Sequence, residues 1–407
     1  RTSPAPKTIE PILPPYEAWL RVNVWNRRMR DDLLERLSRH AGRLPTISLV
    51  MPVHDPPLEC LIKAIDSVRA QVCGEWELCI ADDCSTNPAI RAELERFRAE
   101  DPRIRLTYLD QNLNISLATN RAVELATGEF LLFFDHDDEL TPDAVGEAAL
   151  YLAEHPECDA VYSDDDKIDL SGKRYAPQFK PDWSPELLLS YMYMSHMFVV
   201  RRSLFESVGA MRAGFEGAQD YDLALRVSER TGAVGHIPKV LYHWRALPGS
   251  TASSGAAKPA SLDAGRRAVA EAFARRGIAA RVTQPEFAAA GNLGIYCHEF
   301  PDDGPTVTIL IPTKNQVAVL RQCIESLRAT TYRHYEIVII DNESDDPDTL
   351  AYLRSLPHRV LRIGNPSGRF NFAAINNRAV EQVTGEFVLF LNNDTEVKAP
   401  RWLSQMV

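Results

Sequence analysis

Three segments of this chain recur in the same order further along it. ISLVMPVHD at 47–55 returns as VTILIPTKN at 307–315, CIADDCS at 79–85 as IIDNES at 339–344, and ATNRAVELATGEFLLFFDHDDEL at 118–140 as AINNRAVEQVTGEFVLFLNNDTEV at 374–397. The offset between the copies stays between 257 and 260 residues. Collinear matches at a near-constant offset indicate two copies of one structural unit. We therefore expect one complete unit and the front part of a second.

Within the first copy, short apolar runs alternate with helical patterns. The runs at 47–53, 77–81, 103–109 and 130–134 are typical of strands, and the segments 61–72, 88–100 and 116–127 of helices. This alternation predicts an α/β fold with a doubly wound, mostly parallel sheet. Thr141 and Pro142 indicate the start of a further helix, as its N-cap and first residue. No G-x-G-x-x-G follows the first strand, so the dinucleotide-binding fingerprint is absent.

An acidic cluster follows the apolar run FLLFF at 130–134. Its members are Asp135, His136, Asp137 and Asp138. Open α/β sheets bind ligands at the carboxyl ends of their strands, and three carboxylates within four residues repel one another unless a cation lies among them. Mg²⁺ and Mn²⁺ take oxygen ligands, and Mg²⁺ often shares carboxylates with substrate phosphates. The cluster therefore predicts a metal and diphosphate site, the alternative being a solvated loop that caps the next helix.

Composition excludes several other classes of protein. The formal net charge of -11 over 407 residues argues against a general nucleic-acid-binding surface. Seven cysteines without a C-x-x-C pair indicate neither a disulfide framework nor a zinc knuckle, so we expect the cytoplasm. The longest apolar stretch, 187–200, is shorter than the ~20 residues of a spanning helix. Because the sequence opens at Arg1 without a signal peptide, we expect a piece of a longer protein.

These patterns predict four segments. Residues 1–45 form an extended lead-in and N-terminal helices, and 46–260 form the first complete unit. Residues 261–304 form a helical and strand-bearing connector, and 305–407 form the N-terminal part of the second unit.

Several motifs lie in order along the chain. They are PVHD at 52–55, ADDCS at 81–85, the D-x-D at 135–137, KPDWSPELLLSYMYMSHMFVVRR at 180–202, AQDYDLALR at 218–226 and YHWR at 242–245. In these motifs the chain resembles the family-two glycosyltransferases of the GT-A fold, in particular the tandem-domain enzymes that assemble bacterial surface polysaccharides. The resemblance covers 46–250 fully and 305–407 in part.

The resemblance implies a metal-dependent transferase that moves a hexosyl or deoxyhexosyl group from a nucleotide-diphosphate sugar to an acceptor hydroxyl with inversion. It implies O-antigen or capsule-like polysaccharide synthesis, Mg²⁺ or Mn²⁺ as cofactor, and a glycan acceptor that can be lipid-linked. It also implies a cytoplasmic protein, at most peripherally attached to the inner face of the plasma membrane, that binds no nucleic acid.

Donor-site positions follow from the same resemblance. The implied nucleotide-sugar-binding residues are Pro52, Val53, Asp55, Asp82, Asp83, Asn112, Asp135, His136 and Asp137. Asp82 or Asp83 would meet the base and ribose. Asp137 would bind the metal with Asp135, and His243 matches a position that helps to hold the metal or diphosphate. From sequence alone His243 is equally consistent with a core histidine.

The resemblance makes Asp220 the catalytic base, with Asp222 as the alternative. A sugar hydroxyl is a poor nucleophile at neutral pH, so a positioned carboxylate is needed independently of any family. Both acids are also consistent with simply favouring a helix N-terminus through its dipole. Trp183, His196 and Asp222 are candidate acceptor residues, and a core position is the alternative for Trp183.

The second copy departs from the first. Its equivalents of the donor-site residues are Asn315, Asp341, Asn392 and Asp394, so asparagine replaces Asp135 while Asp394 keeps the position of Asp137. The sequence ends before any counterpart of Asp220, so we expect transfer to depend on the first unit. An exposed sheet edge in the second unit predicts packing against a neighbour or self-association.

Two other functions compete with glycosyl transfer. A phosphohydrolase would use the D-x-D as nucleophile and acid, but it predicts a small residue where this chain has Glu139. A catalytically silent sugar-nucleotide-binding scaffold is the other alternative.

Overall fold

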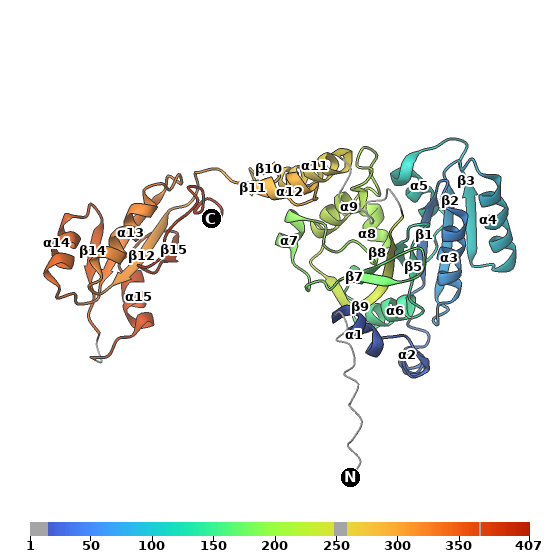
Figure 1. The fold of residues 1–407 in the computed structure, drawn as a ribbon, viewed down its shortest axis with the longest axis horizontal. Helices are drawn as coiled ribbons and strands as arrows, with labels where there is room; N and C mark the ends of the chain where they lie inside the picture. The colour runs from blue at the N-terminus through green and yellow to red at the C-terminus, as the bar shows by residue number, and fades with distance from the viewer. Residues whose placement is uncertain (1–14, 248–258, 366–367) are drawn as a thin grey trace, which may run out of the picture. The chain divides into compact units, whose positions relative to one another are not determined.

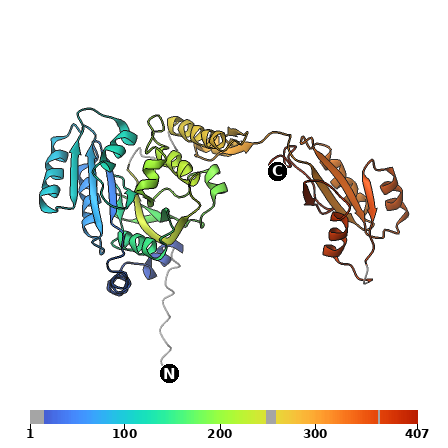
Figure 2. The same cartoon turned by 180° about the vertical axis from the view of Figure 1, so that it is seen from behind.

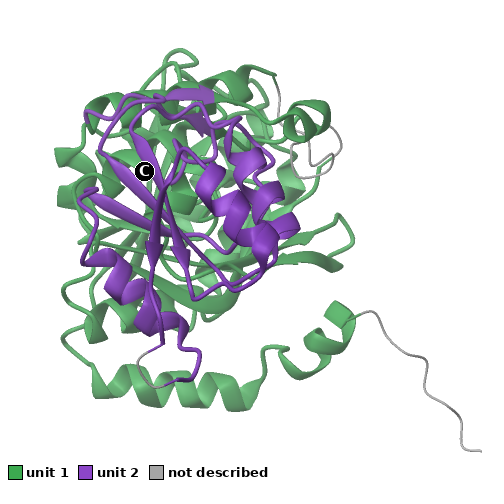
Figure 3. Cartoon of the chain, turned by 90° about the vertical axis from the view of Figure 1, so that its left-hand side faces the viewer, with its two compact units in different colours: residues 1–276, 283–297 green, residues 277–282, 298–407 purple. Residues whose placement is uncertain are grey.

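The computed structural model describes residues 15–247, 259–365 and 368–407 (Figure 1). The chain divides into two compact units, one made of residues 1–276 and 283–297 and the other of 277–282 and 298–407 (Figure 3). The expected lead-in at 1–14 lies outside the described residues. The first unit includes most of the segment that we expected to be a connector.

One sheet forms the centre of the first unit. Its strands are β1 (Ile47–Val53), β2 (Trp76–Asp82), β3 (Ile104–Tyr108), β4 (Phe130–Phe133), β5 (Glu139–Leu140), β6 (Ala160–Ile168), β7 (Arg174–Gln178), β8 (Phe198–Arg201) and β9 (Val234–Arg245). Their order is β3-β2-β1-β4-β8-β6-β9-β5, with β7 beside β6. The first four strands pair in parallel, whereas β5, β7 and β8 run antiparallel to their neighbours. The predicted α/β sheet is confirmed, with a mixed second half.

Helices cover both faces of this sheet. They include α3 (Leu58–Arg69), α4 (Pro88–Glu100), α5 (Asn114–Val123) and α6 (Ala144–Glu154). Apolar residues of α3, α4 and α6 share one core with Ile47, Leu49 and Met51 of β1. Helix α5 packs on β1 and β2 outside that core and covers the opposite face. All seven residues of β1 are buried, as expected for a central strand between two helical layers.

The helix expected to begin at Pro142, with Thr141 as its N-cap, begins two residues later at Ala144. The backbone N–H of Thr141 donates to the carbonyl of Leu241 (3.0 Å), so this residue extends the pairing of β5 with β9. Asp143 stands at the N-cap of α6 instead. The prediction was wrong because a strand contact that the local sequence does not reveal competes for Thr141.

Two helices precede the sheet. Helix α1 (Pro15–Val22) and helix α2 (Arg27–Arg39) follow one another, and the side chain of Asn26 caps α2 by accepting from the Met29 N–H (3.1 Å). Leu33 and Leu37 of α2 are buried in the core, and α2 packs against α6. In the described ranges, no helix has the length and apolar character needed to cross a bilayer.

The rest of the first unit lies around β8 and β9. Its helices are α7 (Pro185–Ser190), α8 (Arg202–Ser207), α9 (Gln219–Ser228), α11 (Pro259–Arg275) and α12 (Glu286–Gly291). Helix α11 packs against α9, and the two lie side by side in Figures 1 and 2. Short strands β10 (Arg281–Thr283) and β11 (Cys297–Glu299) pair with each other, and most of their residues belong to the second unit.

The second unit repeats the parallel half of the first sheet. Its strands β12 (Val307–Thr313), β13 (Tyr335–Asp341), β14 (Arg359–Arg362) and β15 (Phe387–Phe390) take the order β14-β13-β12-β15. Its helices are α13 (Val317–Leu327), α14 (Pro347–Ser355) and α15 (Phe372–Val380). Val307 pairs with Phe387 in the register in which Ile47 pairs with Phe130, so the repeat extends to backbone register.

Candidate active site

A cleft of about 510 Å³ lies where β1, β2 and β4 end. Its lining includes Pro52, Val53, His54, Asp83, Asn112, Asn114, Asp135, His136, Asp137, Glu216, Trp244 and Arg245. Seven of the nine residues predicted for the nucleotide sugar lie here: Pro52, Val53, Asp83, Asn112, Asp135, His136 and Asp137. The carboxyl ends of parallel strands meet at one edge of the sheet, which explains why loops far apart in the sequence share this cleft.

Asp135 and Asp137 bring two acidic groups to the cleft, and their negative charge, when they are ionised, has no cationic partner among the described residues. No hydrogen bond or ion pair engages either carboxylate within the described ranges. Burial, followed by repulsion from Asp137 and Asp220, raises the pKa of Asp135 to about 7. A divalent cation would neutralise this charge, so the pair of oxygen donors fits a hard metal ion.

A second, enclosed cavity of about 50 Å³ adjoins the cleft at Asp135. Ser195, His196, Gln219 and Asp220 also line this cavity. The predicted base and the first residue of the D-x-D therefore face the same space, although they come from different elements. This meeting of Asp135 and Asp220 is the feature that local sequence patterns could not show.

Asp220 stands in the first turn of α9, where its carboxylate accepts the Tyr221 N–H (2.8 Å). Burial raises the pKa of Asp220 above its ordinary range. Asp222 is engaged differently, because its fully buried carboxylate is paired with the guanidinium groups of Arg212 and Arg226. Only Asp220 is left facing the cavity, which favours it over Asp222 as the proton acceptor.

Two residues of YHWR fix the D-x-D loop from β9. The Tyr242 hydroxyl donates to Asp138 Oδ2 (2.6 Å) and accepts the Asp135 N–H (3.3 Å). Arg245 donates its N–H to Asp138 Oδ1 (2.7 Å) and its Nε–H to the Asp137 carbonyl (2.6 Å), and it pairs with Glu139. We did not single out Tyr242 or Arg245 from the sequence, although the motif that contains them was the available signal.

His196 lies at the back of the enclosed cavity. Its ring stacks on Tyr242 (centroids 4.5 Å apart), and burial with the nearby Lys180 ammonium lowers the pKa of His196 to about 3. Lys180 donates to the carbonyls of Met194 (2.7 Å) and His196, and pairs with the buried Asp165 (2.6 Å). The sequence analysis missed Asp165 and Lys180. Three consecutive acids inside the strand run AVYSDDDKI were the signal.

The described residues include one group of potential metal ligands whose donor atoms all lie within 4.8 Å of one another: Asp135, Asp138 and His196. Asp138 is already committed, because its two oxygens accept from Tyr242 and Arg245. Asp135 and Asp137 are better candidates since they face the cleft without partners.

His243 is not brought to this group. Its Nδ1 lies 2.5 Å from Asp166 Oδ1 and its side chain borders another cleft, together with Lys63, Ser67 and Glu139. Alternation along β9 explains this position, because Tyr242 and Trp244 point toward His196 and His243 points the other way. The predicted metal role of His243 has no support in this arrangement.

Two predicted nucleotide residues serve the loops instead. Asp55 Oδ1 accepts the N–H groups of Thr86 (2.9 Å) and Asn87 (3.1 Å), and the Asp55 side chain does not line the cleft. Asp82 is buried and accepts the Ser85 N–H (3.4 Å). Both therefore shape the turn after β2 and do not face the ligand space.

The cleft wall around Asp83 is a connected polar surface. Asp83 Oδ1 accepts the Leu113 N–H (2.7 Å), and His54 Nδ1 donates to the Asp83 carbonyl (2.8 Å). Asn112 Nδ2 donates to His54 Nε2 (3.0 Å). Trp183, a predicted acceptor residue, is partly exposed ahead of α7 and lines neither the cleft nor the enclosed cavity.

The second unit reproduces the turn but changes the acids. Asn315 Oδ1 accepts the N–H groups of Asp345 (3.1 Å) and Asp346 (3.0 Å), as Asp55 does in the first unit. Asp341 accepts the Ser344 N–H (2.9 Å), as Asp82 accepts that of Ser85. Asn392 and Asp394 follow β15, at the places of Asp135 and Asp137 after β4.

Comparison with known sequences gives one family and several relatives. A family model described as glycosyl transferase family 2 matches residues 48–209 and 308–407. The chain is 43% identical to uncharacterized protein y4gI of Sinorhizobium fredii over 96% of its own length and 43% of that protein's. It is 40% identical to O-antigen biosynthesis protein RfbC of Myxococcus xanthus over 98% of its own length and 31% of that protein's. It thus spans less than half of either relative.

Among solved structures, S. aureus TarS in complex with UDP-GlcNAc aligns with 56% of this chain and 66% of its own. The TM-score is 0.47 and the sequence identity is 19%.

Proposed function

Since this chain belongs to glycosyl transferase family 2, we propose that its first unit transfers a sugar from a nucleotide-diphosphate donor to an acceptor hydroxyl. The proposal rests on one observation above all. Asp220 lines a cavity that shares Asp135 with the cleft holding Asp137, so a proton acceptor lies next to a site suited to a diphosphate.

The cleft provides the donor site in this proposal. Asp83, His54 and Asn112 form the wall at which the nucleoside would bind, and Asp137 stands near the ends of β1 and β4, where the diphosphate would lie. Asp135 and Asp137 would hold Mg²⁺ or Mn²⁺, which stabilises the charge that develops on the leaving diphosphate. Tyr242 and Arg245 keep the acidic loop in place through Asp138.

Asp220 provides the other half of the chemistry. As the acceptor oxygen bonds to the anomeric carbon, its proton passes to the Asp220 carboxylate, and the bond from that carbon to the diphosphate oxygen breaks. The nucleoside diphosphate leaves with the bonding electrons. Attack on the face of the anomeric carbon opposite the diphosphate inverts that centre. A base of this kind contributes typically ~10² to 10⁴ in rate.

The relatives indicate the substrate class. RfbC of Myxococcus xanthus is named for O-antigen biosynthesis, and a chondroitin synthase of Escherichia coli is 30% identical over 52% of this chain. We propose a role in bacterial surface polysaccharide synthesis at the cytoplasmic side of the inner membrane. The acceptor is then a growing glycan, and the phosphohydrolase alternative is not retained because the family is one of transferases.

Donor binding can be tested without knowing the acceptor. A panel of UDP-, GDP- and dTDP-sugars is added with Mn²⁺, and the expected result is a rise in melting temperature for one of them. Calorimetry then compares the wild type with Asp137→Ala, which should lose the Mn²⁺-dependent part of binding. Tight, metal-dependent binding by Asp137→Ala would refute the assignment. His243→Ala is the matched control and should bind as the wild type does.

A further inference from the structure

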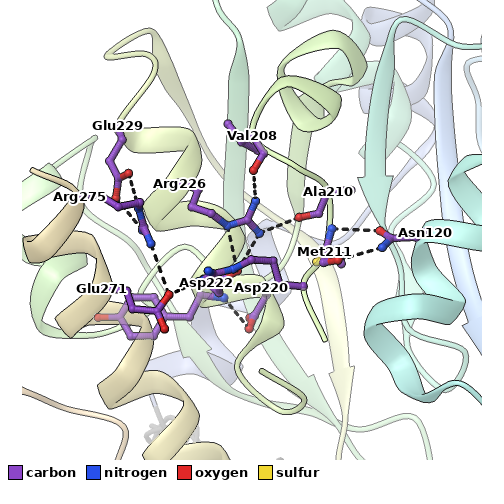
Figure 4. A network of polar contacts seen from close by, with 12 residues as sticks. Asn120, Val208, Ala210, Met211, Asp220, Asp222, Arg226, Glu229, Glu271 and Arg275 are labelled. Carbon is purple, nitrogen blue, oxygen red and sulfur yellow. Dashed lines mark hydrogen bonds and ion pairs between the residues drawn. The ribbon is translucent and has the colours of Figure 1, made fainter. Parts of the chain in front are cut away.

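Helix α11 packs against α9, the helix that carries Asp220, and both helices lie outside the two segments matched by the family model. Besides apolar side chains, a chain of polar contacts joins the two helices (Figure 4). Arg212, in the loop before α9, pairs with Asp222 of α9 and places Nη2 2.8 Å from Glu271 Oε2 of α11. One guanidinium therefore joins the first turn of α9 to α11.

Asp222 is the fixed point of this network. Its carboxylate is fully buried and accepts from Arg212 Nε (3.0 Å) and Arg226 Nη2 (2.7 Å). Arg226 also donates to the carbonyls of Val208 (2.6 Å) and Ala210 (2.7 Å), which holds the loop that leads into α9. A buried carboxylate needs its cationic partners, so the position of Asp222 is closely determined.

Asp220 itself has little to hold it. The N-cap of α9, Ala218, offers no side-chain cap, and the Asp220 carboxylate accepts the adjacent Tyr221 N–H (2.8 Å). The direction in which Asp220 points is therefore set by the turn that carries it. That turn is anchored at Tyr221, whose hydroxyl donates to the Leu188 carbonyl (2.6 Å), and at Asp222, from which the link runs through Arg212 to Glu271.

We propose that Arg212 and Glu271 are positioning residues for the catalytic base, and that α11 is a working part of the first transferase unit. This inference rests on the proposed function of Asp220. It goes beyond that proposal, since it gives a role to α11, which lines neither the cleft nor the cavity at Asp220. A misplacement of a reacting group by about 1 Å can cost on the order of 10²-fold in rate, so a small shift of this turn would be visible.

The chain offers a matched control at the other end of α9. Arg275 on α11 pairs with Glu229, the C-cap of α9 (2.7 Å), and lies 3.8 Å from Glu271 on its own helix, so it ties the two helices at their far end without pairing with Arg212 or Asp222. Arg275→Gln weakens docking of α11 but leaves the first turn of α9 anchored. Arg212→Gln removes the link at the first turn.

The assay measures release of nucleoside diphosphate from the donor that the melting-temperature panel identifies, with water as acceptor. Arg212→Gln should lower kcat by about 10- to 100-fold with KM for the donor changed less than about threefold. Glu271→Gln should lower kcat in the same way but more weakly. Arg212→Lys should recover only part of the kcat lost in Arg212→Gln, because an ammonium cannot meet two carboxylates as a planar guanidinium does. Arg275→Gln should stay within about threefold of the wild type.

Hydrogen exchange gives a readout that needs no turnover. Amides 218–222 should exchange faster in Arg212→Gln and in Glu271→Gln than in Arg275→Gln. Equal losses of kcat in Arg212→Gln and Arg275→Gln, or unchanged kcat and exchange in Arg212→Gln, would overturn the inference. An inactive Asp220→Asn beside a fully active Arg212→Gln would sink this inference alone, whereas an active Asp220→Asn would refute the proposed function.

Discussion

Asp222 and Arg226 stand one helical turn apart in α9 and form an ion pair, with Oδ2 and Nη2 2.7 Å apart and the carboxylate fully buried. Arg212 reaches the same carboxylate from the preceding loop. This arrangement separates the two acids that the sequence left as alternatives, because Asp222 is held between two cations and Asp220 faces the cavity. Asp222 thus has a structural role, and Asp220 is the acid of the two that could take the proton in the proposed reaction.

Asp222→Asn should therefore cost stability. Removing one partner of a buried pair leaves unpaired guanidinium groups, and such changes typically cost about 3–5 kcal/mol. Urea unfolding followed by tryptophan fluorescence measures the loss. The control is Asp31→Asn, which breaks an exposed pair with Arg27 (3.7 Å) and should cost less than about 1 kcal/mol. Equal effects of the two substitutions would contradict the account.

Asp220→Asn should separate binding from turnover. The amide has nearly the shape of the carboxylate but cannot take a proton. The rate at which nucleoside diphosphate is released should therefore fall by about 10²- to 10⁴-fold. Donor affinity in the presence of Mn²⁺ should stay within about threefold of the wild-type value. Asp220 lines the cavity and not the cleft in which the nucleotide would bind. Calorimetry and the diphosphate-release assay on one preparation decide it. Near-normal turnover would show that another group accepts the proton.

The raised pKa of Asp135 predicts that the folding stability of the metal-free protein depends on pH. Its pKa of about 7 lies above the ordinary value of 3.8, so between these pH values the folded protein holds a proton that the unfolded chain has lost. This contribution is fully present below about pH 4 and is lost as the pH rises toward 7. Urea midpoints at pH 5 and pH 7.5 should therefore differ by more in the wild type than in Asp135→Asn. Mn²⁺ should flatten the wild-type dependence, and identical profiles would contradict the prediction.

The strands and their acidic ends could be predicted because both are local. A short apolar run that ends in aspartates, as 130–137 does, reveals a buried strand and a charged strand end at once, and the repeat shows the same unit twice. The start of α6 could not be predicted, because Thr141 is taken by a pairing with Leu241 from a distant segment.

The same limit applies to the site. Asp135 and Asp137 follow from the strand end, but the convergence of Asp220 and His196 on Asp135 depends on how β8 and α9 fold back. The orientation of His243 depends on which face of β9 it occupies, and the motif YHWR does not reveal that. Asp55 was assigned to the ligand although its carboxylate binds backbone N–H groups of its own turn. Lys180 escaped notice because its partner, Asp165, comes from another strand.

The second unit keeps the backbone of the donor half but has Asn392 where the first has Asp135. An asparagine brings no charge to a cation, so the second unit should bind metal and diphosphate more weakly than the first. The central claim is therefore that the first unit carries the transfer reaction and the second does not.

The most direct test compares Asp137→Ala with Asp394→Ala, two matched substitutions at the second acid of each repeat. Both variants are assayed with the same donor and Mn²⁺ for release of nucleoside diphosphate. Asp137→Ala should lose at least about 10²-fold in rate, since the charge on the leaving diphosphate is no longer stabilised, and Asp394→Ala should stay within about twofold of the wild type. Loss of activity in Asp394→Ala with activity retained in Asp137→Ala would show that the working site lies in the second unit.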